Sequence, residues 1–212
     1  MKFIARLTSV IFHPLLFPTY GTLLLILANP GIYGPFEQKL HVVWLVIIFM
    51  LTFVFPAVWV LMMRQLEMIS SLKMESTKER IIPLVAVSTF YLWATWMFKP
   101  NLNMRVPTDQ LIFLMMAGAC ISVFITFFLN ISTKVSLHTL AAGSLVGLLL
   151  IIIRYSPFDL RLILLAFLLV AGLMGTAQLI LKGGTQREVF IGYIVGFTGQ
   201  FIAFTFVSRI IS

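Results

Sequence analysis

Seven long stretches of this chain contain no charged residue, and this segregation constrains its fold more than any other feature. The sequence has 212 residues, of which 15 are Lys or Arg and 7 are Asp or Glu. None of these charges lies in the stretches 8–28, 42–63, 81–98, 110–129, 137–153, 162–181 and 189–208. Hydrocarbon excludes charge, and about 20 apolar residues are enough for a helix to cross a bilayer. The pattern predicts an all-α, polytopic transmembrane helix bundle and excludes a water-soluble globule.

Two of the stretches, 81–98 and 137–153, are near the lower length limit for a span. We expect seven spans, or six if one of these two is re-entrant. The first stretch follows basic residues, as in a signal peptide, but it is long and contains Pro14 and Pro18, so we interpret it as a retained span. The whole chain, residues 1–212, is then expected to form one integral membrane domain.

The distribution of Lys and Arg among the loops predicts the orientation. With seven spans, the amino terminus shares a side with loops 64–80, 130–136 and 182–188, and this side holds nine of the 15 cations. Cytoplasmic loops carry the excess of Lys and Arg, so we expect a multi-pass protein of a bacterial inner membrane with a cytoplasmic amino terminus. The cations are spread over both sides in short loops, which favours anionic lipid headgroups as partners and argues against nucleic acid.

The same alternation of spans brings three polar segments to one side of the membrane, although they are far apart in sequence. They are residues 71–83, 133–138 and 178–188. The three His residues of the chain are far apart and Cys120 is its single Cys, so they supply no ligand cluster and we expect neither a metal site nor another cofactor.

The composition of these segments indicates anion chemistry. Lys73 and Arg80 offer a point charge and a planar fork, which suit phosphate. Ser136 is placed to cap a helix that starts near Leu137, leaving backbone N–H groups for an anion. His138, in the first turn of that helix, could transfer a proton.

Each of these residues also has an ordinary interpretation. A Lys or Arg beside a span is typically an interfacial anchor, and a lone His is more often a hydrogen-bonded structural residue than a catalyst. The Ser76-x-x-Glu79 and Thr185-x-x-Glu188 spacings fit capping boxes, which only start helices.

Taken together, the first two segments resemble motifs of the type 2 phosphatidic acid phosphatase superfamily. The first family motif is Lys-x6-Arg-Pro, and Lys73-x6-Arg80 has its spacing, with Pro83 three residues further on. The second is Pro-Ser-Gly-His, of which Ser136 and His138 are present while the Pro and Gly are not.

The third motif, Ser-Arg-x5-His-x3-Asp, is degenerate in this chain. Its spacing is kept, but Gln178 stands in place of Arg, Gly184 in place of His and Glu188 in place of Asp. The resemblance extends over about residues 64–200. It implies a helical membrane phosphatase fold acting on lipid phosphates or diphosphates.

In that family the third-motif His attacks phosphorus, the second-motif His protonates the leaving group, and the Lys and Arg residues hold the phosphoryl oxygens. By resemblance, Lys73, Arg80 and Ser136 would bind phosphate and His138 would be the acid and base. The nucleophile is missing, because Gly184 has no side chain. His13 could replace it only if the first span packs against the site, whereas His41 lies on the opposite side.

Three functions remain open from the sequence. The first is a catalytically impaired protein of the phosphatase fold that binds a lipid phosphate or diphosphate or serves as a subunit of a membrane complex. The second is an active lipid phosphate or polyprenyl diphosphate phosphatase in which His138 assists attack by water. The third is a transporter or structural membrane subunit. The Gly143-x3-Gly147 and Gly192-x3-Gly196 pairs suit close helix contacts, and we expect these contacts inside the bundle rather than with a partner.

Overall fold

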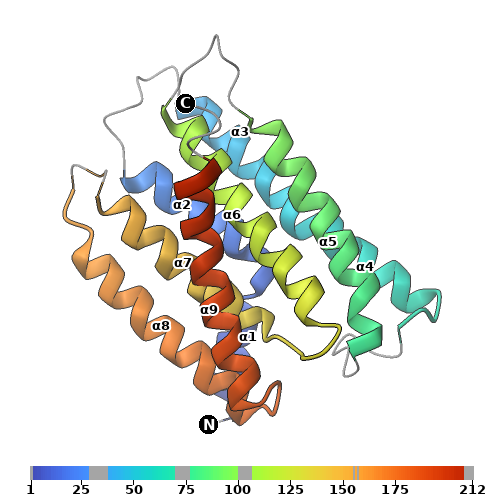
Figure 1. Ribbon diagram of the computed structural model, residues 1–212. Helices are drawn as coiled ribbons and strands as arrows, with labels where there is room; N and C mark the ends of the chain where they lie inside the picture. Colours follow the sequence, from blue (N-terminus) through green and yellow to red (C-terminus); the bar gives the residue numbers. More distant parts are fainter. Residues whose placement is uncertain are drawn as a thin grey trace.

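A computed structural model describes residues 2–28, 38–69, 77–99, 107–154, 156 and 158–207 of the chain. All regular structure among these residues is helical (Figure 1). The α-helices, in chain order, are α1 (Lys2–Ile11), α2 (Phe17–Ala28), α3 (Gln38–Phe49), α4 (Phe55–Gln65), α5 (Thr77–Met97), α6 (Pro107–Leu129), α7 (Leu137–Ile152), α8 (Arg161–Ile180) and α9 (Gln186–Ile202).

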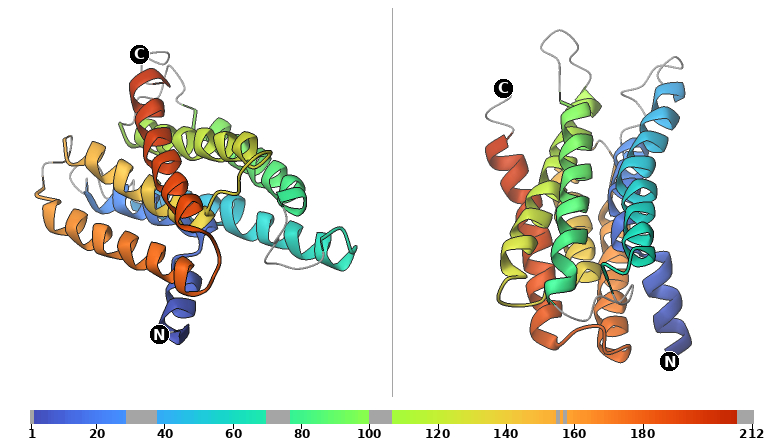
Figure 2. Two further views of the ribbon diagram at one scale, coloured as in Figure 1. Left: turned by 60° about the horizontal axis from the view of Figure 1, so that its bottom comes forward. Right: turned by 90° about the vertical axis from the view of Figure 1, so that its right-hand side faces the viewer.

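The helices make seven passes along the bundle. Helices α1 and α2 form one pass and α3 and α4 another, and six passes contain a helical segment long and apolar enough to cross a membrane. The remaining pass is α7, which has 16 residues. Its length is about 24 Å at 1.5 Å per residue, which is shorter than a typical hydrocarbon core. Helix α1 begins at one end of the bundle and α9 ends at the other (Figure 2). The prediction of a polytopic membrane protein is confirmed.

Prolines account for the two composite passes. A 3₁₀ turn over Pro14–Leu16 separates α1 from α2, and a π-helical turn over Met50–Val54 precedes Pro56 in the first turn of α4. Proline lacks an amide hydrogen and its ring clashes with the preceding turn, so the regular hydrogen-bond ladder is interrupted at both places. The first break places His13 at the junction of α1 and α2.

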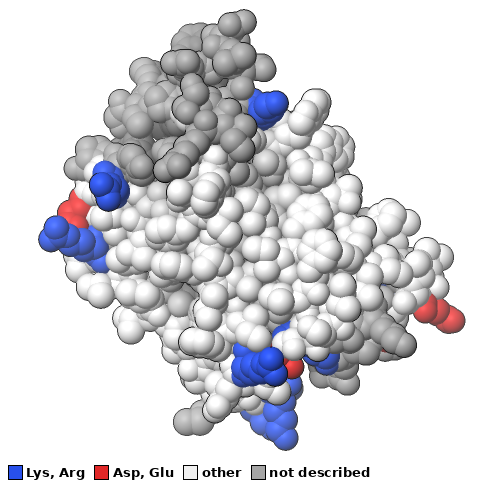
Figure 3. Space-filling model, viewed as in Figure 1, with Lys and Arg blue, Asp and Glu red and all other residues white. Residues whose placement is uncertain are grey.

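The pattern of exposed side chains is the one expected for a protein surrounded by lipid. Large apolar side chains face outward along the outer helices, as in Leu162 (79% exposed) and Leu169 (72%) of α8. On the face in Figure 3, charged side chains lie toward the two ends of the bundle, and the band between them is uncharged. Lipid tails can solvate such a band, whereas water would not.

Helix α7 is the buried centre of the bundle and packs closely on α9. A Cβ atom at Gly143 would collide with the carbonyl oxygen of Tyr193, and one at Gly196 with that of Leu140. The Ser144 hydroxyl donates to the carbonyl oxygen of Gly196 at 3.1 Å. The two glycine pairs thus serve internal packing, as expected from the sequence, because only glycine lets the two backbones approach this far.

Helix α6 packs on the other side of α9 through a second set of small and polar residues. The Ser122 hydroxyl lies 2.8 Å from the carbonyl oxygen of Gly118 and 3.4 Å from that of Val195. The Gln200 side chain, fully buried, donates from Nε2 to the carbonyl oxygen of Met115 at 3.3 Å. These intramembrane polar residues therefore join helices, a common function of such residues in membrane bundles.

Replacing Gly196 by Ala should destabilise the protein, because the new methyl group would push α9 away from α7. We expect a loss of about 1–3 kcal/mol, the usual range for overpacking, measured as a lower melting midpoint in detergent. Gly172→Ala is the control, since no atom lies within 4 Å of its added Cβ. Equal melting midpoints for the two variants would contradict the proposed packing.

Candidate functional site

The described parts of the three polar segments, residues 77–83, 133–138 and 178–188, lie at the end of the bundle where α1 begins. Helix α4 ends there, α5 starts there, and the connections from α6 to α7 and from α8 to α9 lie there as well (Figures 1 and 2). Lys73 and Ser76 lie outside the described residues. The described residues of the predicted site are Arg80, Ser136 and His138, together with the third segment.

Arg80 joins the start of α5 to the segment that leads into α7. Its Nη1 donates to the carbonyl oxygen of Val135 at 3.1 Å, and its guanidinium also interacts electrostatically with the carboxylate of Glu188. The side chain is half-buried. A carbonyl in a non-helical segment inside a membrane protein needs such a donor, so Arg80 has a structural role in addition to any role in binding.

Ser136 is the residue before the first turn of α7, as predicted, but its side chain does not cap the helix. Its backbone N–H donates to the carbonyl oxygen of Glu188 at 3.2 Å, and its own carbonyl accepts from the amide of Leu140 and the hydroxyl of Thr139. The Ser136 hydroxyl is buried and has no hydrogen-bond partner among the described residues. A buried polar atom left unsatisfied is costly, and it marks a place where a ligand or water can bind.

His138 contacts the first pass of the chain. Its Nε2 lies 3.2 Å from the carbonyl oxygen of Ser9. Since a carbonyl only accepts, Nε2 carries the hydrogen and the neutral ring keeps its lone pair on Nδ1. The lone pair of His138 that could accept a proton is therefore the one on Nδ1.

The first span does pack against the site, which was the condition for any contribution from His13. The rings of His13 and His138 are 6.0 Å apart, centroid to centroid, in an edge-on arrangement. The Nδ1 of His13 accepts the backbone N–H of Leu15 at 3.3 Å. The neutral His13 ring therefore carries its hydrogen on Nε2, where it is a donor rather than a nucleophile.

The third segment has the predicted capping box and a turn. The Thr185 hydroxyl accepts from the amide of Glu188, and the carboxylate of Glu188 accepts from the amide of Thr185. Glu188 therefore caps α9, and its carboxylate interacts with Arg80. A Cβ on Gly184 would lie 3.1 Å from a carboxylate oxygen of Glu188. The two positions that the sequence resemblance aligns with the family His and Asp therefore adjoin each other.

Gln178, which the sequence resemblance aligns with the third-motif Arg, is buried near the end of α8. Its Nε2 donates to the hydroxyl of Ser9 at 3.2 Å. Ser9 thus binds two site residues, Gln178 through its hydroxyl and His138 through its carbonyl. Ser9 was not predicted as a site residue. Its place one helical turn before His13 could have suggested it, but only if the first span were known to contact α7 and α8.

Comparisons of the chain with protein-family models, curated proteins and solved structures found no match. Within the described part of the chain, no group of three His, Cys, Asp or Glu side chains is arranged to hold a metal ion. The site is accordingly interpreted from its own residues.

Replacing Gln178 by Leu should loosen the contact between α1 and α8. The change keeps the side-chain volume but removes the hydrogen bond to Ser9, so we expect a loss of about 1 kcal/mol, seen as a lower melting midpoint in detergent. Thr176→Val is the matched control, because the Thr176 hydroxyl is exposed and bonds only within its own helix, to Gly172. A variant as stable as the control would contradict a structural role for Gln178.

Proposed function

We propose that this protein binds the phosphate or diphosphate group of a membrane lipid through a catalytically impaired site of the type 2 phosphatidic acid phosphatase kind. One observation carries the proposal: the hydroxyl of Ser136 at the start of α7 is buried and has no hydrogen-bond partner within the described part of the chain. The Arg80 guanidinium contacts the residue immediately before it. A helix start, a hydroxyl donor and a guanidinium are three kinds of group that bind phosphate oxygens.

The location supports a lipid ligand rather than a soluble one. The start of α7 lies at an end of the bundle, where a phospholipid presents its phosphate, and the adjoining helices are apolar enough to span a membrane. Non-helical backbone in residues 133–136 is tolerated where it is buried in protein or lines a binding site. Lys73 would add a second cation through its spacing to Arg80.

The third segment supports impaired chemistry. Gly184 has no nucleophile, and the neutral Gln178 bonded to Ser9 replaces a cation that would stabilise transferred charge. The Nδ1 of His13 is occupied by the Leu15 amide, so His13 is better suited to donate a hydrogen bond than to attack phosphorus. Loss of a covalent nucleophile lowers rates by orders of magnitude.

Lipid binding tests the proposal. We expect purified protein to bind phosphatidic acid and polyprenyl diphosphate in detergent more tightly than phosphatidylcholine. Arg80→Ala should weaken this binding about 10–100-fold, the effect of removing a charge-assisted hydrogen bond. Ser136→Ala should weaken it about 3–10-fold, as for a neutral hydrogen bond.

Arg64→Ala is the matched control for Arg80→Ala, since Arg64 is an exposed cation in the last turn of α4, close to the same end of the bundle. Melting midpoints of all variants separate weakened binding from weakened folding. Equal affinities in wild type, Arg80→Ala and Arg64→Ala would contradict the proposal and favour a role as a structural subunit of a membrane complex.

A second candidate, an active phosphatase of altered mechanism, is favoured by the paired histidines. The Nδ1 lone pair of His138 could accept a proton from water attacking phosphorus, and the nearby His13 could donate a hydrogen bond to a phosphoryl oxygen. Catalysis of this kind would need no residue at position 184.

Phosphate release distinguishes the two candidates. We expect no release of inorganic phosphate from phosphatidic acid, phosphatidylglycerol phosphate or polyprenyl diphosphate, because the nucleophile is missing. Release by the wild type that disappears in both Lys73→Ala and His138→Ala, but persists in Arg64→Ala, would contradict the impaired site and establish the second candidate.

A further inference from the structure

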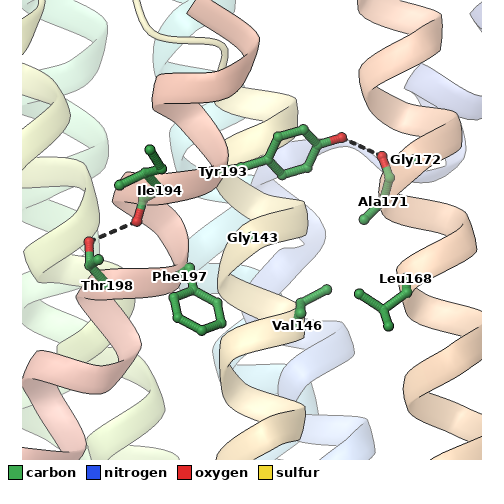
Figure 4. Close-up of a pocket in the computed structure, with 9 residues that line it drawn as sticks. All are labelled: Gly143, Val146, Leu168, Ala171, Gly172, Tyr193, Ile194, Phe197 and Thr198. Atoms are coloured by element: carbon green, nitrogen blue, oxygen red, sulfur yellow. Dashed lines mark hydrogen bonds between the residues drawn. The ribbon is translucent and has the colours of Figure 1, made fainter.

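A groove of about 410 Å³ opens between α8 and α9, away from the residues of the proposed phosphate site. The two helices are joined by a short hairpin and then diverge, with α7 between them (Figure 1). Gly143 and Val146 of α7 line the groove between the side chains of the two diverging helices (Figure 4). Leu168 and Gly172 line it from α8, and Phe197 lines it from α9.

The polar groups along the groove are already hydrogen-bonded. The hydroxyl of Tyr193 donates to the carbonyl oxygen of Ala171 and bridges α9 to α8 (Figure 4). The hydroxyl of Thr198 donates to the carbonyl oxygen of Ile194 in its own helix at 2.7 Å. An occupant of the groove therefore needs to supply no hydrogen bond to these hydroxyls, so a hydrocarbon chain can bind there without leaving a polar group unsatisfied.

The surroundings of the groove determine its occupant. Helices α8 and α9 are both candidate membrane spans, and the groove-lining side chains of Leu168 and Ile194 are exposed and apolar. In a bilayer the medium at this level consists of lipid tails. Because water is excluded from this level, an apolar groove that opens to the medium suits a lipid tail as its occupant.

Two cations lie where the groove narrows toward the α8–α9 hairpin. Lys182 is in the hairpin and Arg187 is in the first turn of α9, and both are exposed. Lys182 has a backbone φ of 54°, a conformation that favours glycine. Along a helix the distance from Lys182 to the level of Gly172 is about 15 Å, so a lipid with its phosphate at the hairpin can extend a tail into the groove.

We propose that this groove binds one acyl chain of an anionic phospholipid, with the headgroup held by Lys182 and Arg187. The site uses neither Arg80 nor Ser136, so it does not depend on the proposed phosphate site. The expected ligand is a bulk anionic lipid of the membrane, bound beside the bundle.

Photolabelling in nanodiscs tests the proposal with a phosphatidylglycerol that carries a diazirine in one acyl chain. Gly172→Trp should fill the groove without a clash at the Cβ, since no atom lies within 4 Å of that position. We expect labelling of α8 and α9 to fall about tenfold, the effect of losing roughly two methylene contacts. Gly172→Ala should label like the wild type.

The headgroup contacts are tested by two further variants. Lys182→Gly removes the charge and relieves the positive φ, so the fold should be kept, and Arg187→Gln removes the second charge. Each should lower the preference for phosphatidylglycerol over phosphatidylcholine probes about fivefold, as expected for one cation near a membrane surface. Arg161→Gln, at the opposite end of α8, should leave the preference unchanged.

Three outcomes would overturn the inference. The first is unchanged labelling of α8 and α9 in a folded Gly172→Trp variant. The second is a change of oligomeric state in that variant by native mass spectrometry without loss of labelling, which would assign the groove to a second copy of the chain. The third is loss of labelling in Arg80→Ala, which would mean that the tail belongs to the lipid bound at the proposed phosphate site.

Discussion

The close contact between α7 and α9 is the interaction on which the rest of the structure depends. Association of helices in lipid gains little from the hydrophobic effect, because lipid tails are as apolar as the side chains, so close packing must replace it. Gly143 and Gly196 let the two backbones approach until side-chain atoms at these positions would collide with carbonyl oxygens. That approach fixes the start of α7 beside the start of α9, where Ser136 bonds to Glu188.

The non-helical segment before the short central helix α7 needs hydrogen-bond partners from other helices. The segment that precedes α7 lies at the end of the bundle, but Val135 and Ser136 are buried there, so their backbone polar groups need partners from other helices. Arg80 supplies one for Val135, and Glu188 supplies one for Ser136. The segment at the start of α7 is therefore held by contacts from α5 and α9.

The first pass, α1 and α2, contacts both the start of α7 and the end of α8. The proline break after α1 puts His13 opposite His138, while Ser9, one turn earlier, contacts both His138 and Gln178. Ser9 thus joins the start of α7 and the end of α8 in one neutral, hydrogen-bonded polar cluster.

The sequence by itself determined the polytopic helix bundle and predicted seven spans or six, of which the structure has six candidates. It also predicted that the start of α5 shares an end with the α6–α7 and α8–α9 connections, because a bilayer excludes charge and alternating spans fix which loops meet. It also identified the Thr185–Glu188 capping box, a purely local pattern. Only the tertiary structure decided that the Ser136 hydroxyl has no hydrogen-bond partner among the residues it describes, that Ser9 contacts both His138 and Gln178, and that α8 and α9 diverge over a groove. These features depend on contacts between residues far apart in the chain and on helix crossing, which charge patterns and local spacing do not encode.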